Sequence, residues 1–468
     1  MKHRPRTDHA ALGAAFYDPV QAAHFPQHIL RHRNRRAAAS IGLDELSDKQ
    51  WLDHFGRFEP LPGSFETPLA LRYHGHQFQN YNPDLGDGRG FLFAQLEELA
   101  TGRLLDLGTK GSGRTPWSRG GDGRLTLKGG FREVLATAML EALGVDTSKS
   151  LSLVETGEEL ERGDEPSPTR SAVLVRLSHS HIRIGTFQRL AYHRDEASLR
   201  RLLDYCIKTY MPGLWEDELP ARAAAFLGAV AERVARTGAR ITAAGFVHGV
   251  LNTDNINITG ESFDYGPWRF LPTYDPAFTA AYFDQSGLYA FGRQPDTLAW
   301  NLTRLAETLV PLGEIGDLEA ALNRFWPAFQ REIWAAILDR LGLQSRGDEA
   351  DAELVTALFT FLHGSQVPFE QFFFDWRGGR LSADRAAGGP AAGHYTSPAF
   401  APLRALIEQH EPAPTAKLEH PYFARQHPRT MLIEEVEALW APIADADDWG
   451  PFEAALTEIE EMRSAYAG

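Results

Sequence analysis

Cysteine is almost absent from this chain of 468 residues, which contains a single one, Cys206. One cysteine cannot form an intramolecular disulfide, and it cannot supply a zinc site made of several thiolates. Its sequence context, LLDYCIKTY, is mostly apolar, which favours a buried small side chain over a reactive thiol. We therefore expect a fold without disulfide or thiolate-zinc cross-links.

Long apolar runs and an excess of positive charge are also missing. No apolar run approaches the roughly 18 residues of a membrane span. The basic N-terminus, MKHRPRTDHAALGAAFYDP, has only a short apolar stretch and no convincing cleavage site. The formal net charge is −15, with 62 acidic residues against 47 Lys and Arg, which argues against nucleic acid or an anionic membrane as a main partner. We expect a cytoplasmic protein, and a nucleotide stays open as a ligand because it needs only a local cluster of cations.

Two signatures of phosphate-binding and zinc enzymes are missing as well. The chain contains no Gly-Lys dipeptide and hence no Walker A loop. The histidine clusters YHGHQF and SHSHIR lack the H-E-x-x-H arrangement of a zinc enzyme. We predict no metal at these histidines.

Alternating apolar residues are present between residues 71 and 178. They predict strands in GFLFAQLEE and RLLDLGTKG, which lie between glycine-rich loops, and in SAVLVRLS (171–178). The segment GGFREVLATAMLEALGV instead has its apolar residues at helical spacing. This part of the chain therefore predicts a strand-rich unit with one embedded helix.

The rest of the chain is mostly helical in pattern. Strongly amphipathic helices are predicted at 297–312 and 318–343, and the last helices at about 430–441 and 451–465. Residues 1–70 read as short helical pieces with loops, and the segments 383–402 and 411–417 as linkers or exposed loops, because they are rich in Gly, Ala and Pro.

This organisation predicts an α+β, protein-kinase-like bilobal fold with the nucleotide between the lobes. The expected parts are an N-terminal extension (1–70), a strand-rich N-lobe with nucleotide loops (71–190), a helical C-lobe with the catalytic loop (191–345) and a C-terminal helical extension (346–468).

The stretch FVHGVLNTDNINITGESFDYGP (246–267) is similar to a kinase catalytic loop, H-R-D-L-x-x-x-N followed by D-F-G. The positions in register are His248, Leu251 and Asn255, and then Asp264-Tyr265-Gly266. We interpret His248 as a structural residue that packs under the loop. Val250, however, stands where a kinase has its catalytic Asp, so a kinase-like site would lack its base.

Lys110 and Glu133 are candidates for a phosphate-binding pair. Lys110 ends a predicted strand and Glu133 is expected in the first turn of the next helix, which is how kinases orient a phosphate-binding lysine. The alternative is a surface lysine and an acid that favours the helix dipole.

Asn255 and Asp264 are the candidate metal ligands, since Mg²⁺ prefers amide and carboxylate oxygens. The intervening INITGESF could form a short hairpin that presents both side chains to one point. Both residue types are also common turn formers, which is the alternative.

Three further segments combine glycine with positive charge: DLGDGRG (84–90), GSGRTPWSRGGDGR (111–124) and VRLSHSHIRIG (175–185). Bare backbone amides and arginine side chains bind phosphate oxygens. The alternative is that such segments form ordinary glycine turns, which is their usual structural role.

Taken together these segments resemble the selenoprotein O family, kinase-fold proteins that transfer AMP rather than phosphate. The matching stretches run in order from about 68 to 312 and include LGDGR, GTKGSGRTPWSRGGDGR, REVLATAML, SHSHIRIGTFQ, HGVLNTDN, DYGP and QPDTLAWNLTRLAETL. The resemblance implies a protein adenylyltransferase that uses ATP and Mg²⁺, or Mn²⁺, to modify Ser, Thr or Tyr hydroxyls of protein substrates and releases pyrophosphate.

The resemblance also implies residue roles. Lys110, Arg176 and Arg183 would bind phosphates, and Glu133 would orient Lys110. The other nucleotide contacts would be Gly86, Gly88, Arg89, Asp122, Gly123 and Asp264. Asn255 and Asp264 would hold the metal ion, and Asp254 would be the general base that replaces the missing kinase Asp. An Asp in a Thr-Asp-Asn turn is the alternative for Asp254.

The chain departs from the family pattern in two places. Gln79 and Asp84 stand where many members have Gly and Gln, so the loop between them could be shaped differently. The tail, EMRSAYAG, lacks the family's frequent selenocysteine or cysteine, so thiol regulation through the tail is not expected.

Two other hypotheses remain. A small-molecule phosphotransferase would need an Asp at position 250. A nucleotide-binding pseudoenzyme with a signalling or scaffold role would not need the full set of phosphate and metal ligands.

Overall fold

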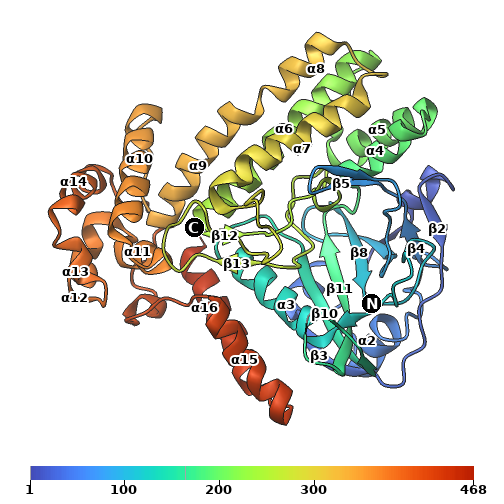
Figure 1. Cartoon of the computed structure of the whole chain (residues 1–468), viewed down its shortest axis with the longest axis horizontal. Helices are drawn as coiled ribbons and strands as arrows, with labels where there is room; N and C mark the ends of the chain where they lie inside the picture. The colour runs from blue at the N-terminus through green and yellow to red at the C-terminus, as the bar shows by residue number, and fades with distance from the viewer. Residues whose placement is uncertain (1, 164, 468) are drawn as a thin grey trace.

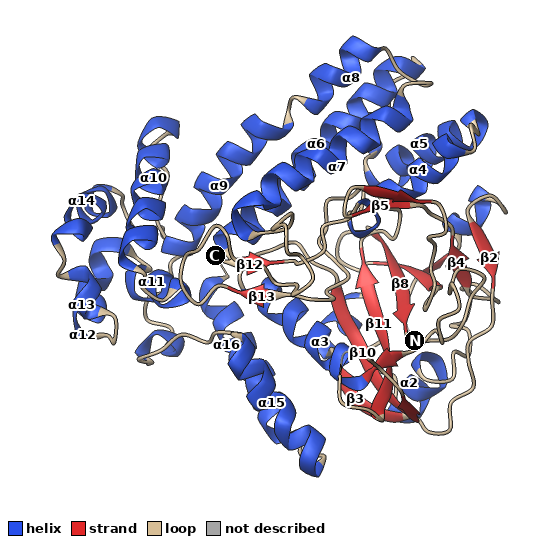
Figure 2. Ribbon diagram, viewed as in Figure 1, coloured by secondary structure: helices blue, strands red, loops and turns tan. Residues whose placement is uncertain are grey.

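A computed structural model describes residues 2–163 and 165–467 of the chain. A large antiparallel sheet occupies one side of the molecule and most of the helices occupy the other (Figure 1, Figure 2). None of the helices that these residues form has the length and apolar character that crossing a membrane requires.

The main sheet has nine strands in the order β2-β4-β7-β8-β11-β10-β3, with β1 paired to β7 and β9 paired to β11. The strands are β1 (Pro5–Arg6), β2 (Tyr17–Pro19), β3 (Ile29–Arg33), β4 (Leu69–Leu71), β7 (Leu92–Glu97), β8 (Leu104–Lys110), β9 (Leu125–Thr126), β10 (Lys149–Leu160) and β11 (Thr169–Ser178). The three strands predicted from alternation are confirmed as β7, β8 and β11.

The N-terminal segment contributes more to this sheet than its sequence pattern indicates. The expectation of short helical pieces and loops across 1–70 holds for α1 (Arg35–Ser40) and α2 (Asp48–Phe55) but misses four strands. β3 forms one edge of the sheet beside β10, and β2 forms the other edge beside β4. These strands are short and pair with segments distant in the chain, so local alternation gives little signal for them.

Helix α3 (Leu127–Ala142) lies across one face of the sheet, as its apolar spacing predicts. Phe131, Val134, Leu135 and Met139 are all buried in the cluster that α3 shares with the sheet and with α16. Thr126 caps the helix by accepting a hydrogen bond from the backbone N–H of Gly129. This packing fixes the position of Glu133 on the same helix.

The helical half is built around α6, against which α7, α8 and α9 pack (Figure 1). Its helices are α4 (Ile184–Tyr192), α5 (Glu196–Tyr210), α6 (Leu219–Ala243), α7 (Gln294–Leu309), α8 (Ile315–Leu322) and α9 (Phe325–Leu341). The single helix predicted at 318–343 is wrong, because the chain breaks between α8 and α9. Pro327 explains the break: proline lacks the N–H that an interior position needs and is tolerated only in the first turn of a helix.

The C-terminal part is helical throughout most of its length: α10 (Asp348–Ser365), α11 (Phe369–Trp376), α12 (Ala383–Gly388), α13 (Ala392–Tyr395), α14 (Ala401–Gln409), α15 (Ile433–Ala446) and α16 (Gly450–Tyr466). The expected linker at 383–402 is wrong. Tyr395 and Phe400 from this stretch are buried against Trp376, so its small residues permit close helix packing rather than flexibility. The loop at 411–417 and the last two helices are confirmed.

Two small hairpins complete the fold and position the site. β5 (Gly75–Gln77) pairs with β6 (Asn80–Asn82), and β12 (Phe246–Val247) pairs with β13 (Arg269–Phe270). The long loop between β12 and β13 follows α6 and carries the kinase-like motif. Within it, Thr253–Asn255 form a short 3₁₀ turn.

Candidate active site

A cleft of about 680 Å³ lies between the sheet and the β12–β13 loop. Of the residues predicted for the site, the following line it: Gly86, Gly88, Arg89, Lys110, Asp122, Gly123, Arg176, Arg183, Asp254, Asn255 and Asp264. Glu133 is the exception, and it lies directly behind the wall. Segments almost 180 residues apart in the chain are thus brought to one place.

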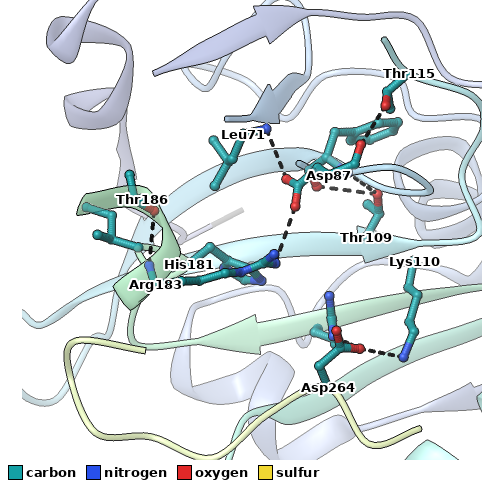
Figure 3. Close-up of polar contacts among 12 residues, drawn as sticks. Leu71, Asp87, Thr109, Lys110, Thr115, His181, Arg183, Thr186 and Asp264 are labelled. Carbon is teal, nitrogen blue, oxygen red and sulfur yellow. Dashed lines mark hydrogen bonds and ion pairs between the residues drawn. The ribbon is translucent and has the colours of Figure 1, made fainter. Parts of the chain in front are cut away.

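Lys110 stands at the end of β8 and makes two ion pairs. Its Nζ lies 2.6 Å from Oε2 of Glu133. The same Nζ lies 2.6 Å from Oδ1 of Asp264 (Figure 3). Glu133 is the seventh residue of α3 and is completely buried. The expectation that it lies in the first helical turn is wrong, because the helix begins earlier, at Leu127, and the alternative of a surface acid is wrong as well. A buried carboxylate between cations orients the lysine toward the cleft.

Arg176, on β11, joins the same cluster. Its Nη1 lies 3.4 Å from Oε1 of Glu133 and 3.1 Å from Oδ1 of Asp264. Burial alone would raise the pKa of Asp264, but the positive charges of Lys110, Arg176 and Arg89 hold the pKa of this carboxyl well below its ordinary value. Asp264 is therefore ionised throughout the physiological range.

Arg183 precedes α4 and is held from several sides. Its guanidinium stacks 4.0 Å from the ring centre of Tyr73. Nη2 of Arg183 lies 3.3 Å from Oδ1 of Asp87 (Figure 3). Asp87 is itself fixed by the backbone N–H of Leu71, which donates to Oδ2 at 3.0 Å. Sequence reasoning missed Asp87 and Tyr73; the position of Asp87 between Gly86 and Gly88 was the only local signal.

Gly86 and Gly88 have a steric reason to be glycine. A Cβ on Gly86 would lie 2.4 Å from the ring of Trp117, and one on Gly88 would lie 2.8 Å from the Trp117 carbonyl oxygen. The two glycine-rich loops therefore pack directly on each other. Ser118 Oγ also donates to the Gly88 carbonyl, which joins the loops by a hydrogen bond.

The outer part of the cleft is lined by a second cationic group. Asp122 lies 2.8 Å from Nη1 of Arg162 and accepts the backbone N–H of Arg124 at 2.9 Å. Arg119, Arg124 and Arg162 all line the cleft and were not predicted. Phosphate or another anionic group is the chemistry that such a wall attracts.

The surroundings of Asp254 differ from those of the ion-paired residues in the same cleft. It is 8% exposed, and its buried Oδ1 has no hydrogen-bond partner among the described residues. Burial raises the pKa of Asp254 to about 6, although the charge of Arg183 pulls it down. A carboxylate with a raised pKa and an unused lone pair is suited to accept a proton.

The backbone around Asp254 is held by β5, which sequence reasoning missed. The N–H of His76 donates to Thr253 Oγ1 at 2.7 Å, and Thr253 donates to Oε1 of Gln188 at 2.7 Å. Gly75 approaches so closely that a Cβ there would lie 3.0 Å from Asp254 Oδ1. The YHGHQF cluster therefore supports the β12–β13 loop through His76.

Asn255 and Asp264 are connected by a short, bridged turn, as the predicted hairpin requires: Ile256 and Ser262 form an antiparallel bridge. The Asn255 amide nitrogen donates to the Val250 carbonyl at 3.0 Å, which leaves the amide oxygen as the atom able to bind a cation. Asp264 has φ of 63°, in the left-handed region, and its two ion pairs both use Oδ1.

The donor set fits a hard divalent cation bound together with a nucleotide. No group of three or more His, Cys, Asp or Glu that could hold a metal occurs among residues 2–163 and 165–467. Mg²⁺ commonly takes only one or two protein oxygens and completes its shell with water and substrate phosphates. Asn255 and Asp264 beside a cationic wall match that arrangement.

Two other residues behave as their sequence context predicts. His248 is buried, and its Nε2 lies 3.0 Å from the Phe263 carbonyl oxygen, so it supports the loop from beneath. Cys206 is a free, completely buried thiol.

Comparisons with known proteins agree with the geometry. The family model described as protein adenylyltransferase SelO matches residues 1–460. Proteins named protein nucleotidyltransferase YdiU are similar over nearly the whole chain. The one from Gloeobacter violaceus is 46% identical, covering 98% of this chain and 94% of its own, and the one from a Synechocystis species is 44% identical, covering 96% of both. The one from Vibrio cholerae is 40% identical over 78% of this chain and 72% of its own.

Proposed function

Because the chain belongs to the SelO family and is a protein nucleotidyltransferase, we propose that its cleft transfers AMP from ATP to Ser, Thr or Tyr hydroxyls of proteins. The sheet with α3 would act as a kinase-like N-lobe, and the half built around α6 as the C-lobe. The nucleotide would lie in the cleft between them, with its phosphates on the cationic wall.

The observation that carries the proposal is the contrast between two carboxylates in one cleft. Oδ1 of Asp264 pairs with Lys110 and Arg176, whereas the buried Oδ1 of Asp254 has no hydrogen-bond partner among the described residues. These surroundings lower the pKa of Asp264 and raise that of Asp254 to about 6. Groups whose surroundings push their pKa values apart are suited to different tasks: the first accepts a proton, and the second remains charged. Asp264 and Asn255 would hold Mg²⁺, which would supply charge neutralisation at the phosphates.

The residues of this chain would then act as follows. Asp254 accepts the proton of the attacking hydroxyl, whose oxygen forms a bond to the α-phosphorus. The bond from the α-phosphorus to the oxygen that bridges to the β-phosphate breaks, and pyrophosphate leaves with that electron pair. Lys110, Arg176 and Arg183 stabilise the charge that develops on the leaving group. Glu133 keeps Lys110 in place.

The competing functions lack support of this kind. A phosphotransferase would place its base at position 250, where Val250 offers no ionisable group. A scaffold would have no use for a buried carboxylate oxygen that lacks a hydrogen-bond partner within the described part of the chain, because burying it costs stability.

Labelled ATP tests the proposal. The purified protein is incubated with Mg²⁺ and ATP that carries label on either the α- or the γ-phosphate, with casein as a generic acceptor. Covalent label from the α-position alone is the expected result. Label from the γ-position alone would overturn the proposal in favour of a kinase. Bound ATP without covalent label from either position, on casein or on the protein itself, would favour the scaffold.

A further inference from the structure

Three aromatic side chains lie beside Asn252, which lines the cleft, and the reaction as proposed does not use them. Tyr282 is 85% exposed and Phe283 is 46% exposed, although large aromatic side chains are normally buried. Phe283 lies 5.2 Å from Tyr282 and 5.9 Å from Phe78, measured between ring centres. We call Phe78, Tyr282 and Phe283 the aromatic shelf.

The shelf is attached to the site through Phe78. The backbone N–H of Phe78 donates to Oδ1 of Asn252 at 3.1 Å, and its ring packs 4.9 Å from that of Tyr289. The Tyr289 hydroxyl donates a hydrogen bond to the same Asn252 oxygen. Asn252 lines the cleft and precedes Asp254 by two residues. The shelf therefore adjoins the cleft through Asn252, two residues from Asp254.

The backbone that presents Phe78 is strained. Phe78 and Gln79 form the two-residue turn between β5 and β6 and have φ of 49° and 63°. Such a turn favours Asn-Gly, and a bulky residue in the left-handed region costs of the order of 1–2 kcal/mol. Strain of this kind persists where the surroundings hold it in place, as Asn252 and Tyr289 do here, and it is concentrated at functional sites.

The loop that carries the other two rings is anchored. The carboxylate of Asp284 accepts the backbone N–H groups of Leu288 at 2.9 Å and of Tyr289 at 2.8 Å. Asp284 itself is buried. Tyr282 and Phe283 are thus presented to solvent by a fixed turn rather than by a loose segment.

We propose that the aromatic shelf binds an apolar side chain of the protein substrate, within a few residues of the hydroxyl that receives AMP. This deepens the proposed function and rests on it. The occupant follows from the position of the shelf: the enzyme acts on proteins, and the shelf adjoins Asn252, two residues from the Asp254 carboxylate that the acceptor hydroxyl must reach. Rigid, exposed aromatic rings are the side chains that dominate such contacts, and their preferred partners are apolar.

Two peptides and two variants test this inference. Each peptide carries one Ser in an extended, polar sequence, with either Phe or Gln two residues before and two residues after it. Transfer of AMP from α-labelled ATP is measured as kcat/KM. The wild type is expected to favour the Phe peptide by about tenfold, which is the scale of discrimination by one apolar contact. The double variant Y282A/F283A should lose this preference through a higher KM for the Phe peptide, with unchanged affinity for ATP.

Trp326→Ala is the matched control. Trp326 lies on α9 and has the same exposed fraction as Phe283, 46%, but its ring packs against Phe325 and Phe329 on the same helix rather than against the aromatic shelf. This variant should keep the wild-type preference. If it loses the preference as well, the effect is not specific to the shelf and the inference is wrong.

The remaining outcomes separate the inference from the proposed function. A wild type that labels both peptides equally, from the α-phosphate, overturns the inference and leaves the function intact. A wild type that labels neither peptide nor casein overturns both. Sedimentation covers one more case: a wild-type dimer that Y282A/F283A converts to a monomer would show that a second copy of the chain occupies the shelf, which also overturns the inference.

Discussion

Asp254 and Asp264 lie ten residues apart in one loop and line the same cleft, but their surroundings are opposite. Asp264 is bound by Lys110 and Arg176, and its pKa is held well below the ordinary value. Asp254 is 8% exposed, and its buried Oδ1 has no hydrogen-bond partner among residues 2–163 and 165–467. Burial raises its pKa to about 6. Two aspartate side chains thus acquire different acid–base properties from their surroundings.

The difference also indicates how each of the two carboxylates contributes to folding stability. Asp264 completes an ion-pair cluster, so the folded protein gains from its charge. For Asp254 the cost of desolvation outweighs the attraction of Arg183, so the folded protein loses stability when Asp254 is ionised. We expect the first to hold the site together and the second to carry the chemistry.

The largest effect on AMP transfer is expected for Asp264→Asn. The variant loses a metal ligand and leaves the charges of Lys110 and Arg176 without their shared partner. Transfer of α-label to casein should fall by about 10³-fold, measured at saturating Mg²⁺ and ATP. Asp317→Asn, at an exposed position on α8, is the control and should be unaffected. Transfer within tenfold of wild type for Asp264→Asn would contradict the metal-ligand role.

Glu133→Gln should have a smaller effect, because Lys110 keeps its second partner. Removing the buried charge weakens the orientation of Lys110 and Arg176, so kcat/KM for ATP should fall by about 10²-fold, mainly through KM. Initial rates at varied ATP concentration measure this. An unchanged KM would show that Glu133 supports only the fold.

Thermal unfolding of the protein without nucleotide or metal sharpens the comparison. A carboxyl with a raised folded-state pKa is destabilising once pH exceeds that pKa, so Asp254→Asn should stabilise the protein by about 2 kcal/mol at pH 7.5. The gain should shrink as pH falls through about 6 and vanish near 4. Asp264 has a lowered pKa, so its ionised form stabilises the fold at pH values above its unfolded-state pKa. Asp264→Asn should therefore lower Tm at pH 7.5 and have progressively less effect in acid. Shifts of the same sign for both variants at pH 7.5 would contradict the contrast.

The smallest effect is expected for Gly75→Ala. The added Cβ would lie 3.0 Å from Asp254 Oδ1 and 3.0 Å from a methyl group of Leu85, so the carboxylate must move by a few tenths of an ångström. Transfer should fall about three- to tenfold with unchanged ATP affinity, since small displacements of a reacting group are costly. Gly213→Ala is the control, because a Cβ there meets nothing within 4 Å. Equal rates for both variants would show that Asp254 tolerates displacement.

Local sequence patterns correctly predicted the helices and strands that are determined by residue spacing within one segment. The spacing of Phe131, Val134 and Leu135 predicted α3, and alternation predicted β8 with Lys110 at its end. The failures have a common cause: tertiary packing decides them. The Gly, Ala and Pro of 383–402 predicted a linker, but Tyr395 and Phe400 are buried there between helices.

The same holds for the site. Asp254, Asn255 and Asp264 were recognised because they share one short motif in the sequence. Asp87 and Tyr73 were missed because their contacts with Arg183 join segments about 100 residues apart. The supports of the catalytic loop, from His76 through Thr253 to Gln188, are of the same kind. No spacing rule within one segment reveals such contacts.

The most direct test of the central claim is Asp254→Asn, with Mg·ATP binding and AMP transfer measured on the same preparation. The account predicts an affinity for ATP within about threefold of wild type and a transfer rate lower by about 10²–10⁴, the usual contribution of a general base. Transfer within tenfold of wild type would contradict the claim, because the proton would then have another acceptor. A loss of ATP binding equal to the loss of transfer would contradict it as well, because Asp254 would then be part of the nucleotide-binding wall.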